Sequence, residues 1–159
     1  MLGDIHAGKS FIAAAYRLTN TISASNMPEA AVFDIASLGG TTIYELWDTA
    51  GHERYGIAAP MYLRAATIAI LVFDLNNEAS FNNKEKWYTE IKKDALAEVE
   101  VLVVRNKSDL VEQRKVSVDR GEAWALEESA FYMDFSTKTG PKTAIISKLD
   151  EMVNNMMLN

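Results

Sequence analysis

The chain has 159 residues, of which 48% are hydrophobic and 24% are charged, and this composition predicts one globular domain over residues 1–159. The net charge of −6 excludes a nucleic-acid-binding surface, because phosphate neutralisation needs clustered lysine and arginine side chains. The absence of cysteine excludes disulfides, cysteine-bound zinc and catalytic thiols.

The sequence also carries no signal that directs a chain into or across a membrane. No apolar run is long enough to cross a bilayer, and the N-terminus lacks the layout of a signal peptide. A prenylation site would require a cysteine near the C-terminus. We therefore expect a cytoplasmic protein whose membrane attachment is not encoded in this chain.

Predicted strands and helices alternate along the chain. The predicted strands are Ala31–Ser37, Thr41–Asp48, Thr67–Leu75, Val99–Arg105 and Phe131–Ser136, and the predicted helices are Phe11–Leu18, Glu78–Leu96, Val118–Ser129 and Thr143–Met157. Gly39-Gly40 suits a hairpin turn between the first two strands. Thr67–Leu75 and Val99–Arg105 are nearly continuous apolar runs, which indicates strands covered on both faces. The alternation predicts an α/β fold, with a mixed, mostly parallel six-stranded sheet flanked by helices.

The start of the chain does not supply a complete first strand. Only Met1 and Leu2 precede a glycine-bounded loop, Gly3–Ser10, although a loop of this kind should leave a central strand. We expect this first strand to be truncated in the sequence as given and to be completed by upstream residues. In an α/β sheet, ligands bind at the carboxyl ends of the strands, so the following loops should carry the chemistry.

The first of these loops has the spacing of a phosphate-binding loop. Residues 3–10 read Gly-Asp-Ile-His-Ala-Gly-Lys-Ser, which matches G-x-x-x-x-G-K-S/T. Glycines let backbone N–H groups surround a phosphate, and the loop leads into a helix N-terminus that favours anions. Lys9 is expected to reach the β- and γ-phosphates, and Ser10 to give its hydroxyl to Mg²⁺. The predicted nucleotide-binding residues here are Gly3, Asp4, Ile5, His6, Ala7, Gly8, Lys9, Ser10 and Phe11.

A D-x-x-G sequence follows the second predicted strand. Asp48 stands at the strand tip, where its carboxylate is predicted to hold Mg²⁺ together with Ser10. The N–H of Gly51 is predicted to sense a γ-phosphate. A simple strand-to-helix cap by Asp48 is the alternative, but the nearby phosphate loop favours the metal role.

Asn106-Lys107-Ser108-Asp109 follows the strand that ends at Arg105. A carboxylate here can accept hydrogen bonds from the guanine N1–H and exocyclic amine, which adenine does not offer, so the wrong base leaves a buried acceptor unpaired. A second segment, Ser136-Thr137-Lys138, is expected to add a backbone N–H to the guanine oxygen. The predicted base-reading residues are Asn106, Lys107, Asp109, Leu110, Ser136, Thr137 and Lys138.

These motifs resemble the Ras-like small GTPases and, within them, the Rab family. The cues are Trp47-Asp48-Thr49-Ala50-Gly51-x-Glu53-Arg54-Tyr55, Tyr62-Leu63-Arg64-Ala65-Ala66, Phe73-Asp74, and Glu78-x-Ser80-Phe81, while Ala59-Pro60-Met61-Tyr62 resembles the early-endosomal subgroup. The resemblance implies a P-loop small G-domain that binds GTP or GDP and Mg²⁺ and recruits effectors in vesicle traffic. It also implies an exchange factor, a GTPase-activating protein and a peripheral location on endosomal membranes. Trp47 and Tyr62, with Phe33, fall where such proteins present an effector-facing surface; core packing is the alternative.

The chain departs from the family pattern where hydrolysis is controlled. Residues 19–33 contain no Thr-x-Gly; Thr21, Ser23 and Ser25 are the nearest hydroxyls. His52, the predicted catalytic residue, stands where a glutamine should orient the attacking water. The shorter imidazole predicts slow hydrolysis; the alternative is that it compensates by acting as a general base. Ile5 would crowd an incoming arginine finger. The sequence as given ends at Asn159 without a prenylatable tail, so we expect either that the tail has been cut off or that membrane attachment comes from elsewhere.

The leading interpretation is a Rab-like GTP/GDP switch and weak GTPase that acts in membrane traffic. One alternative is a pseudo-GTPase that serves as a protein-interaction module, which the missing threonine, Ile5 and His52 would favour. An ATP-using P-loop enzyme is disfavoured by the segment 106–109. A further hypothesis is that this chain is one half of a tandem GTPase.

Overall fold

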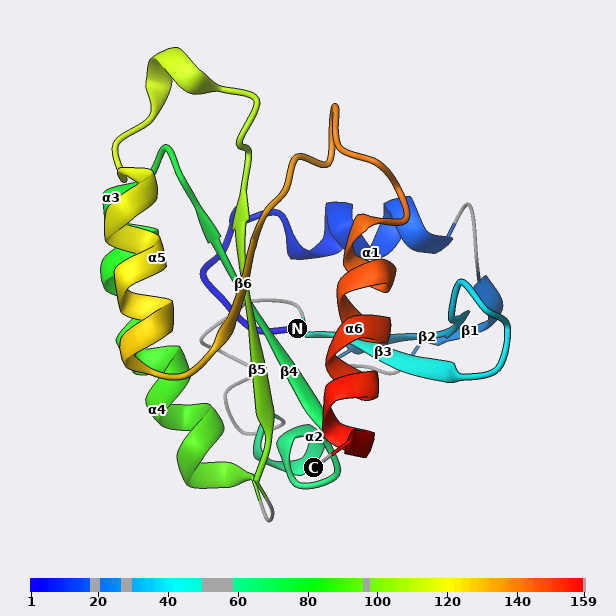
Figure 1. The fold of residues 1–159 in the computed structure, drawn as a ribbon. Coiled ribbons are helices and arrows are strands. Elements are labelled where there is room, and N and C mark those ends of the chain that lie inside the picture. The colour runs from blue at the N-terminus through cyan, green and yellow to red at the C-terminus, as the bar shows by residue number, and fades with distance from the viewer. Residues whose placement is uncertain (18–20, 27–29, 50–58, 96–97, 159) are drawn as a thin grey trace.

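The computed structural model describes residues 1–17, 21–26, 30–49, 59–95 and 98–158. Within them the elements follow one another as α1 (Lys9–Arg17), β1 (Thr21–Asn26), β2 (Ala30–Ala36), β3 (Ile43–Thr49), α2 (Ala59–Leu63), β4 (Ile68–Asp74), α3 (Glu78–Asn82), α4 (Lys84–Asp94), β5 (Glu100–Asn106), the 3-10 helix η2 (Val111–Gln113), α5 (Val118–Glu127), β6 (Phe131–Asp134) and α6 (Ala144–Leu158). Figure 1 shows helices on both sides of the central strands. The predicted α/β class is therefore confirmed.

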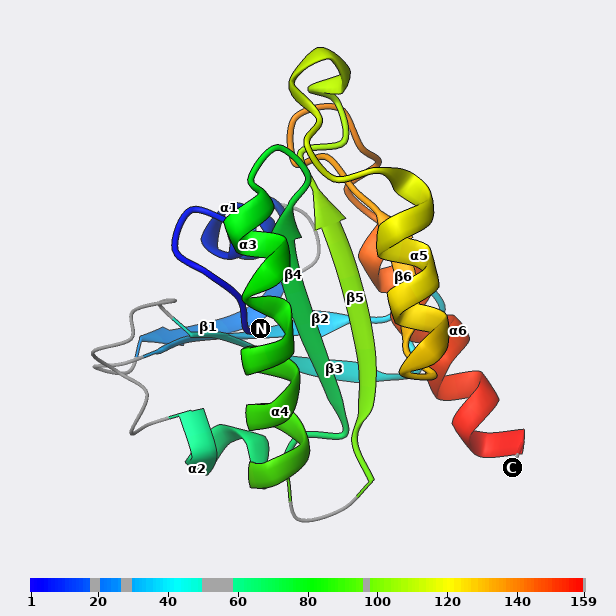
Figure 2. The same cartoon turned by 90° about the vertical axis from the view of Figure 1, so that its left-hand side faces the viewer.

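Strands β4, β5 and β6 form a parallel sheet with both faces covered. Alternate side chains of β4 enter different cores: Val72 packs with α1 and α6, whereas Phe73 packs with α4 and α5. Figure 2 shows α3 and α4 lying end to end along one side of this sheet. The register places Asp74 beside Asn106, so the carboxyl ends of β4 and β5 meet at the same edge. The prediction that these apolar runs are buried strands is confirmed.

Strands β1, β2 and β3 form a separate antiparallel sheet. The predicted hairpin between β2 and β3 is present, and Gly40 takes the positive φ of 69° that the turn requires. Strand β1 was not expected from the sequence, because Thr21–Asn26 lacks the apolar pattern of a buried strand. Its pairing with β2 accounts for this segment.

Met1 and Leu2 lie between the two sheets. Leu2 pairs in parallel with Leu71 of β4, while the Met1 nitrogen donates to the carbonyl of Trp47 on β3 at 2.6 Å. Beside Met1, a cavity of about 480 Å³ separates residues 42–47 of the β3 side from residues 67–70 of the β4 side. Within the described ranges, the strands thus form two three-stranded sheets linked through Met1 and Leu2, rather than the single six-stranded sheet expected.

The predicted helix Glu78–Leu96 is two helices, α3 and α4. Asn83 ends the first and precedes the second, and its backbone N–H bonds to the carbonyl of Ala79 at 2.9 Å. The short helix α2 was also not predicted. The break at Asn83 matters for the site, because it turns the Asn83 side chain toward the phosphate loop.

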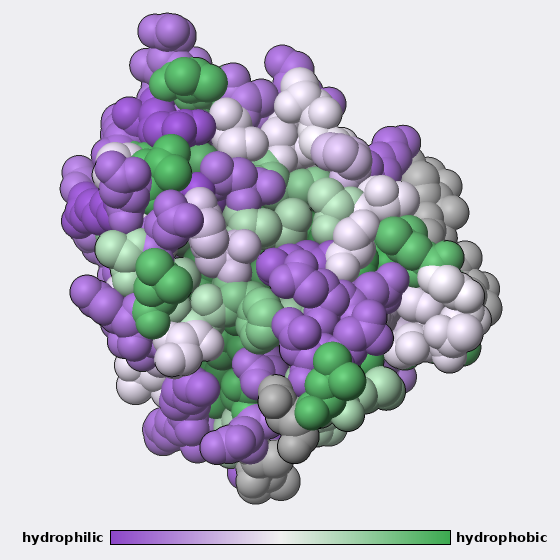
Figure 3. All heavy atoms as spheres, viewed as in Figure 1, coloured by the Kyte–Doolittle hydropathy of each residue, from purple (hydrophilic) through white to green (hydrophobic). Residues whose placement is uncertain are grey.

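In Figure 3, strongly hydrophobic side chains lie singly among hydrophilic ones over α5 and η2. Leu126 of α5 and Val111 of η2 are 74% and 62% exposed. Single exposed apolar side chains are ordinary for a globular domain. In the described parts of the chain, no helix has the length and apolarity needed to span a bilayer.

Candidate functional site

The loop Gly3–Ser10 lies against the carboxyl ends of β4 and β5. A Cβ atom on Gly3 would stand 2.0 Å from the Val72 carbonyl oxygen, and one on Gly8 would stand 2.0 Å from Nδ2 of Asn106. Both glycines also have positive φ, 135° and 101°. Glycine is required at both positions, since any side chain would push the loop away from the strands that support it.

Lys9, the first residue of α1, is enclosed by this loop and is only 4% exposed. Its Nζ donates to the carbonyl oxygens of Gly3 and Asp4, both at 2.7 Å. Burial lowers the Lys9 pKa, while Asp48 and Asp4 oppose that shift. The loop therefore holds a desolvated cation beside the N-terminus of α1, an arrangement that attracts phosphate.

Asp48 and Ser10 come together from β3 and α1. Asp48 is 8% exposed; burial raises its pKa, whereas a hydrogen bond from Ser10, the Met1 nitrogen and Lys9 lower it. The buried Oδ1 of Asp48 has no hydrogen-bond partner. Mg²⁺ is bound in proteins through few carboxylate and hydroxyl oxygens and keeps several waters, so this pair fits that ion. No cluster of three or more acidic, histidine or cysteine side chains that could hold a metal occurs among the described residues.

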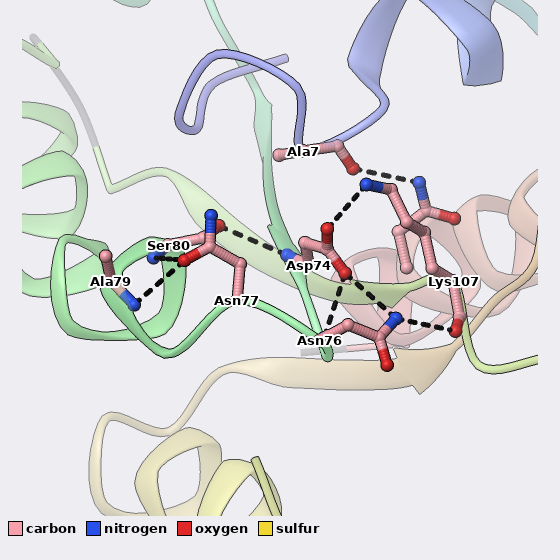
Figure 4. A network of polar contacts seen from close by, with 8 residues as sticks. Ala7, Asp74, Asn76, Asn77, Ala79, Ser80 and Lys107 are labelled. Atoms are coloured by element: carbon pink, nitrogen blue, oxygen red, sulfur yellow. Dashed lines mark hydrogen bonds and ion pairs between the residues drawn. The ribbon is translucent and has the colours of Figure 1, made fainter. Parts of the chain in front are cut away.

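Asn106 connects the phosphate loop to the base-reading segment. It is fully buried, and its Nδ2 donates to the Ala7 carbonyl at 2.9 Å. Lys107 follows with a φ of 63°, and its Nζ bonds to Oδ2 of Asp74 at 2.5 Å. Asn76 completes the network, because it bonds to Asp74 through its backbone N–H and to the Lys107 carbonyl through Nδ2 (Figure 4). The ends of β4 and β5 are thereby joined.

Asp109 and Ser136 join the two predicted base-reading segments. The Ser136 hydroxyl is buried and donates to Oδ1 of Asp109 at 2.7 Å. The Ser136 hydroxyl oxygen also accepts hydrogen bonds from the backbone N–H groups of Lys138 and Thr139, at 3.2 and 3.1 Å. Ser136 therefore orients Asp109 and shapes its own loop. Thr137 is half-buried beside it, and Leu110 closes the turn by donating its N–H to the Lys107 carbonyl at 3.1 Å.

Three predicted loop residues turn their side chains outward. Ile5 and Phe11 are 50% and 76% exposed, and His6 is also exposed, with a φ of 65°. Gly51 and His52 lie outside the described residues, so their predicted roles stay predictions.

The two aromatic residues of the predicted effector surface are adjacent. The ring centroids of Trp47 and Tyr62 are 4.6 Å apart, and Trp47 Nε1 donates to Oε1 of Glu45 at 2.5 Å. Both residues are half-buried, so part of each residue remains accessible to solvent. Phe33 lies on β2 opposite Leu46; its side chain is outside what the structure describes.

Sequence reasoning missed the side-chain anchors behind the loops. Oδ2 of Asp4 accepts from Asn83 Nδ2 at 2.7 Å, and Oδ1 accepts from Trp87 Nε1 at 2.8 Å. Asp4 thus turns its carboxylate toward the α3–α4 junction. Asp74 and Asn76 were also missed as site residues, although their position after the apolar strand β4 was a usable signal.

Comparisons with known proteins agree with this arrangement. The sequence model of the Ras family matches residues 1–157. The chain is 39% identical to Ras-related protein RABF2a of Arabidopsis thaliana, over 142 residues that cover 87% of this chain and 71% of the relative. It is 37% identical to Ras-related protein RABF2b of the same plant, with the same coverage. It is 35% identical to Ras-related protein Rab5A of Oryza sativa subsp. japonica, over 87% of this chain and 70% of the relative.

Proposed function

Because the chain belongs to the Ras family and is a small GTPase of the Rab type, we propose that it is a Mg²⁺-dependent GTP/GDP switch with slow hydrolysis. The observation that carries this proposal is the convergence of three loops at one edge of the parallel sheet. Asn106 ties the phosphate loop to β5, and Ser136 ties Asp109 to the loop after β6. One end of this site is cationic, and the other presents a carboxylate.

Phosphate binding is assigned to the loop Gly3–Ser10 and to Phe11, through their backbone N–H groups. Lys9 already sits inside the loop with its ammonium group held by two carbonyl oxygens. Phosphate oxygens are stronger partners for a desolvated ammonium than neutral carbonyls are, because both groups are charged. Phosphate binding is therefore favoured by the Lys9 ammonium group, whose charge is destabilised by burial while no phosphate is bound.

Ser10 and Asp48 are the residues that would hold Mg²⁺. The ion would neutralise phosphate charge, and it would pair with the buried oxygen of Asp48 that has no hydrogen-bond partner. Removing Mg²⁺ with a chelator should therefore accelerate nucleotide release.

Guanine recognition is assigned to Asp109, supported by Asn106, Lys107, Leu110 and the segment 136–138. A carboxylate that Ser136 has already oriented loses little freedom when it binds the N1–H and amine of guanine. Adenine offers no such pair of donors, so ATP should compete poorly.

We infer slow hydrolysis from three features of the sequence. His52 replaces the glutamine that orients the attacking water in this family, no Thr-x-Gly occurs in residues 19–33, and Ile5 is bulky. We assign effector recruitment to the surface around Trp47 and Tyr62, whose adjacent half-buried rings offer aromatic area to a partner. The likeness to Rab5 proteins supports a role on endosomal membranes in vesicle transport.

The test combines nucleotide binding with single-turnover hydrolysis on the purified chain. We expect co-purified guanine nucleotide, faster release of labelled GDP in chelator, and phosphate release on the order of 10⁻⁴ s⁻¹ or slower. His52→Gln should accelerate hydrolysis, whereas His52→Ala should slow it only slightly, because the imidazole orients the water poorly. A strong loss of hydrolysis in His52→Ala would instead identify the imidazole as a general base.

Asp109→Asn supplies the matched test of base recognition. The variant should lose affinity for GDP and gain affinity for xanthosine diphosphate, because an amide donates where the carboxylate accepts. Bound GTP that persists for days would favour a non-hydrolysing interaction module. A folded protein with no measurable affinity for GDP or GTP in Mg²⁺ would overturn the proposal.

A further inference from the structure

A charged side chain is fully buried directly beneath the base-reading segment. Arg105 precedes Asn106 at the end of β5, after the apolar residues Val101–Val104, and its exposed fraction is 0%. Burying a guanidinium group is costly unless several partners satisfy it. The groups that contact the Arg105 guanidinium therefore indicate the structural role of this buried charge.

The partners of Arg105 come from β6 and α5. Its Nε lies 2.5 Å from Oδ1 of Asp134, as an ion pair that is not aligned as a hydrogen bond. Nη1 donates to the Val118 carbonyl at 2.6 Å, and Nη2 donates to the Tyr132 hydroxyl. The guanidinium carbon also stands 4.2 Å from the centroid of the Tyr132 ring. One side chain thus binds the last two elements that precede the second base-reading segment.

Helix α5 is shaped to admit this side chain. A Cβ atom on Gly121 would lie 2.8 Å from Cδ and 3.2 Å from Nη1 of Arg105. Glycine destabilises a helix interior relative to alanine. Its presence here leaves room for α5 to pack directly against the guanidinium group.

The backbone of Arg105 extends the same connection into the base-reading loops. Its carbonyl accepts the Phe135 N–H at 2.9 Å, and the Phe135 carbonyl accepts the Ser108 N–H at 3.1 Å. The next residues in the chain, Asn106 and Ser136, make the bonds to the phosphate loop and to Asp109. The relative position of the two base-reading segments therefore depends on how β6 docks on β5.

We propose that Arg105 is a positioning residue for guanine recognition, which holds the segments 106–109 and 136–138 in register through Asp134, Tyr132 and Val118. The inference rests on the proposed function and names a determinant of its base selectivity. Without the guanidinium group, β6 and α5 lose their common partner, and the Asp109 carboxylate shifts relative to the base. Small misplacements of a recognition group are expensive, because its hydrogen bonds depend on alignment.

The test compares Arg105→Met, Arg105→Lys and the surface variant Arg120→Met. Methionine keeps apolar bulk without charge, and lysine restores the charge but not the fork of donors. Arg120 is an exposed arginine of α5, the helix that Arg105 contacts, and it pairs with Glu78. Its variant therefore controls for the loss of an arginine side chain near this helix. The readouts are the dissociation rate of fluorescent GDP and the ratio of GDP to inosine diphosphate affinity, since inosine lacks the exocyclic amine.

We expect Arg105→Met to accelerate GDP release and to lower the GDP-to-inosine ratio, each by about tenfold. Arg105→Lys should recover part of both effects, and Arg120→Met should match the parent. A folded Arg105→Met variant with a lower melting temperature but unchanged ratio and release rate would overturn the inference, since the residue would then act only on stability. Should Arg105→Met not fold, Asp134→Asn decides: it should shift the ratio in the same direction, and an unchanged ratio counts against the inference. A parent protein without affinity for GDP would instead refute the proposed function.

Discussion

Replacing Asn106 with alanine should weaken both the fold and nucleotide binding, because this side chain joins two loops in the interior. Asn106 is 0% exposed, and its amide donates to the Ala7 carbonyl at 2.9 Å. Alanine would leave that carbonyl without its side-chain partner. An unsatisfied buried group costs about 1–3 kcal/mol, and for a domain of this size that corresponds to a melting temperature lower by roughly 2–12 °C.

The same variant should release GDP faster. GDP binding needs the phosphate loop in its native position. If holding the loop there costs the same ~1–3 kcal/mol in the variant, GDP affinity falls roughly 5- to 150-fold. Thermal unfolding of the nucleotide-free protein and dissociation of fluorescent GDP measure the two effects. Asn154→Ala, on the exposed face of α6, is the matched control and should change neither quantity. Equal melting temperatures and release rates for the two variants would refute the assigned role of Asn106.

Three further variants test neighbouring contacts. Asp4→Ala removes the carboxylate that Asn83 and Trp87 hold, so the loop should loosen and GDP should leave several-fold faster in stopped-flow measurements. Lys93→Ala, an exposed residue of α4, is the control, and an unchanged rate for Asp4→Ala would show that the anchor is dispensable. Gly8→Ala places a Cβ 2.0 Å from Asn106 Nδ2 at a φ of 101°, so calorimetry should show a strongly destabilised protein. Gly40→Ala is the control: its Cβ meets nothing within 4 Å, so it should show only the modest cost of a positive φ. Burial raises the Asp48 pKa above its usual value, so the folded state holds the proton more tightly and the stability of the nucleotide-free protein declines as pH rises through the folded pKa. Asp48→Asn should remove that decline and also the Mg²⁺ dependence of GDP release. A variant that kept both would contradict the metal assignment.

Local sequence patterns predicted the parts of this protein that rely on neighbours in the chain. The apolar runs of β4 and β5 are long enough to require burial on both faces, whatever packs against them. The glycine spacing of the loop 3–10 and the polar residues directly after β5 likewise follow from local backbone geometry. Helix boundaries were close for α5 and α6, since capping and periodicity are local properties; Ser117, for example, accepts the Arg120 N–H to begin α5.

Tertiary contacts decided the rest. Strand β1 forms because it pairs with β2. The helix break at Asn83 contributes to the site only because Asn83 Nδ2 lies 2.7 Å from Oδ2 of Asp4, 79 positions earlier in the chain. The orientation of Asp109 depends on Ser136, and Arg105 is tolerable in the interior only because β6 and α5 supply its partners. Sequence spacing carries no information about such pairs, because they form when distant segments are packed together. The sequence by itself determined which loops meet at the sheet edge and what chemistry they carry, whereas the packing of β6 and α5 on β5 determined where each of those groups points.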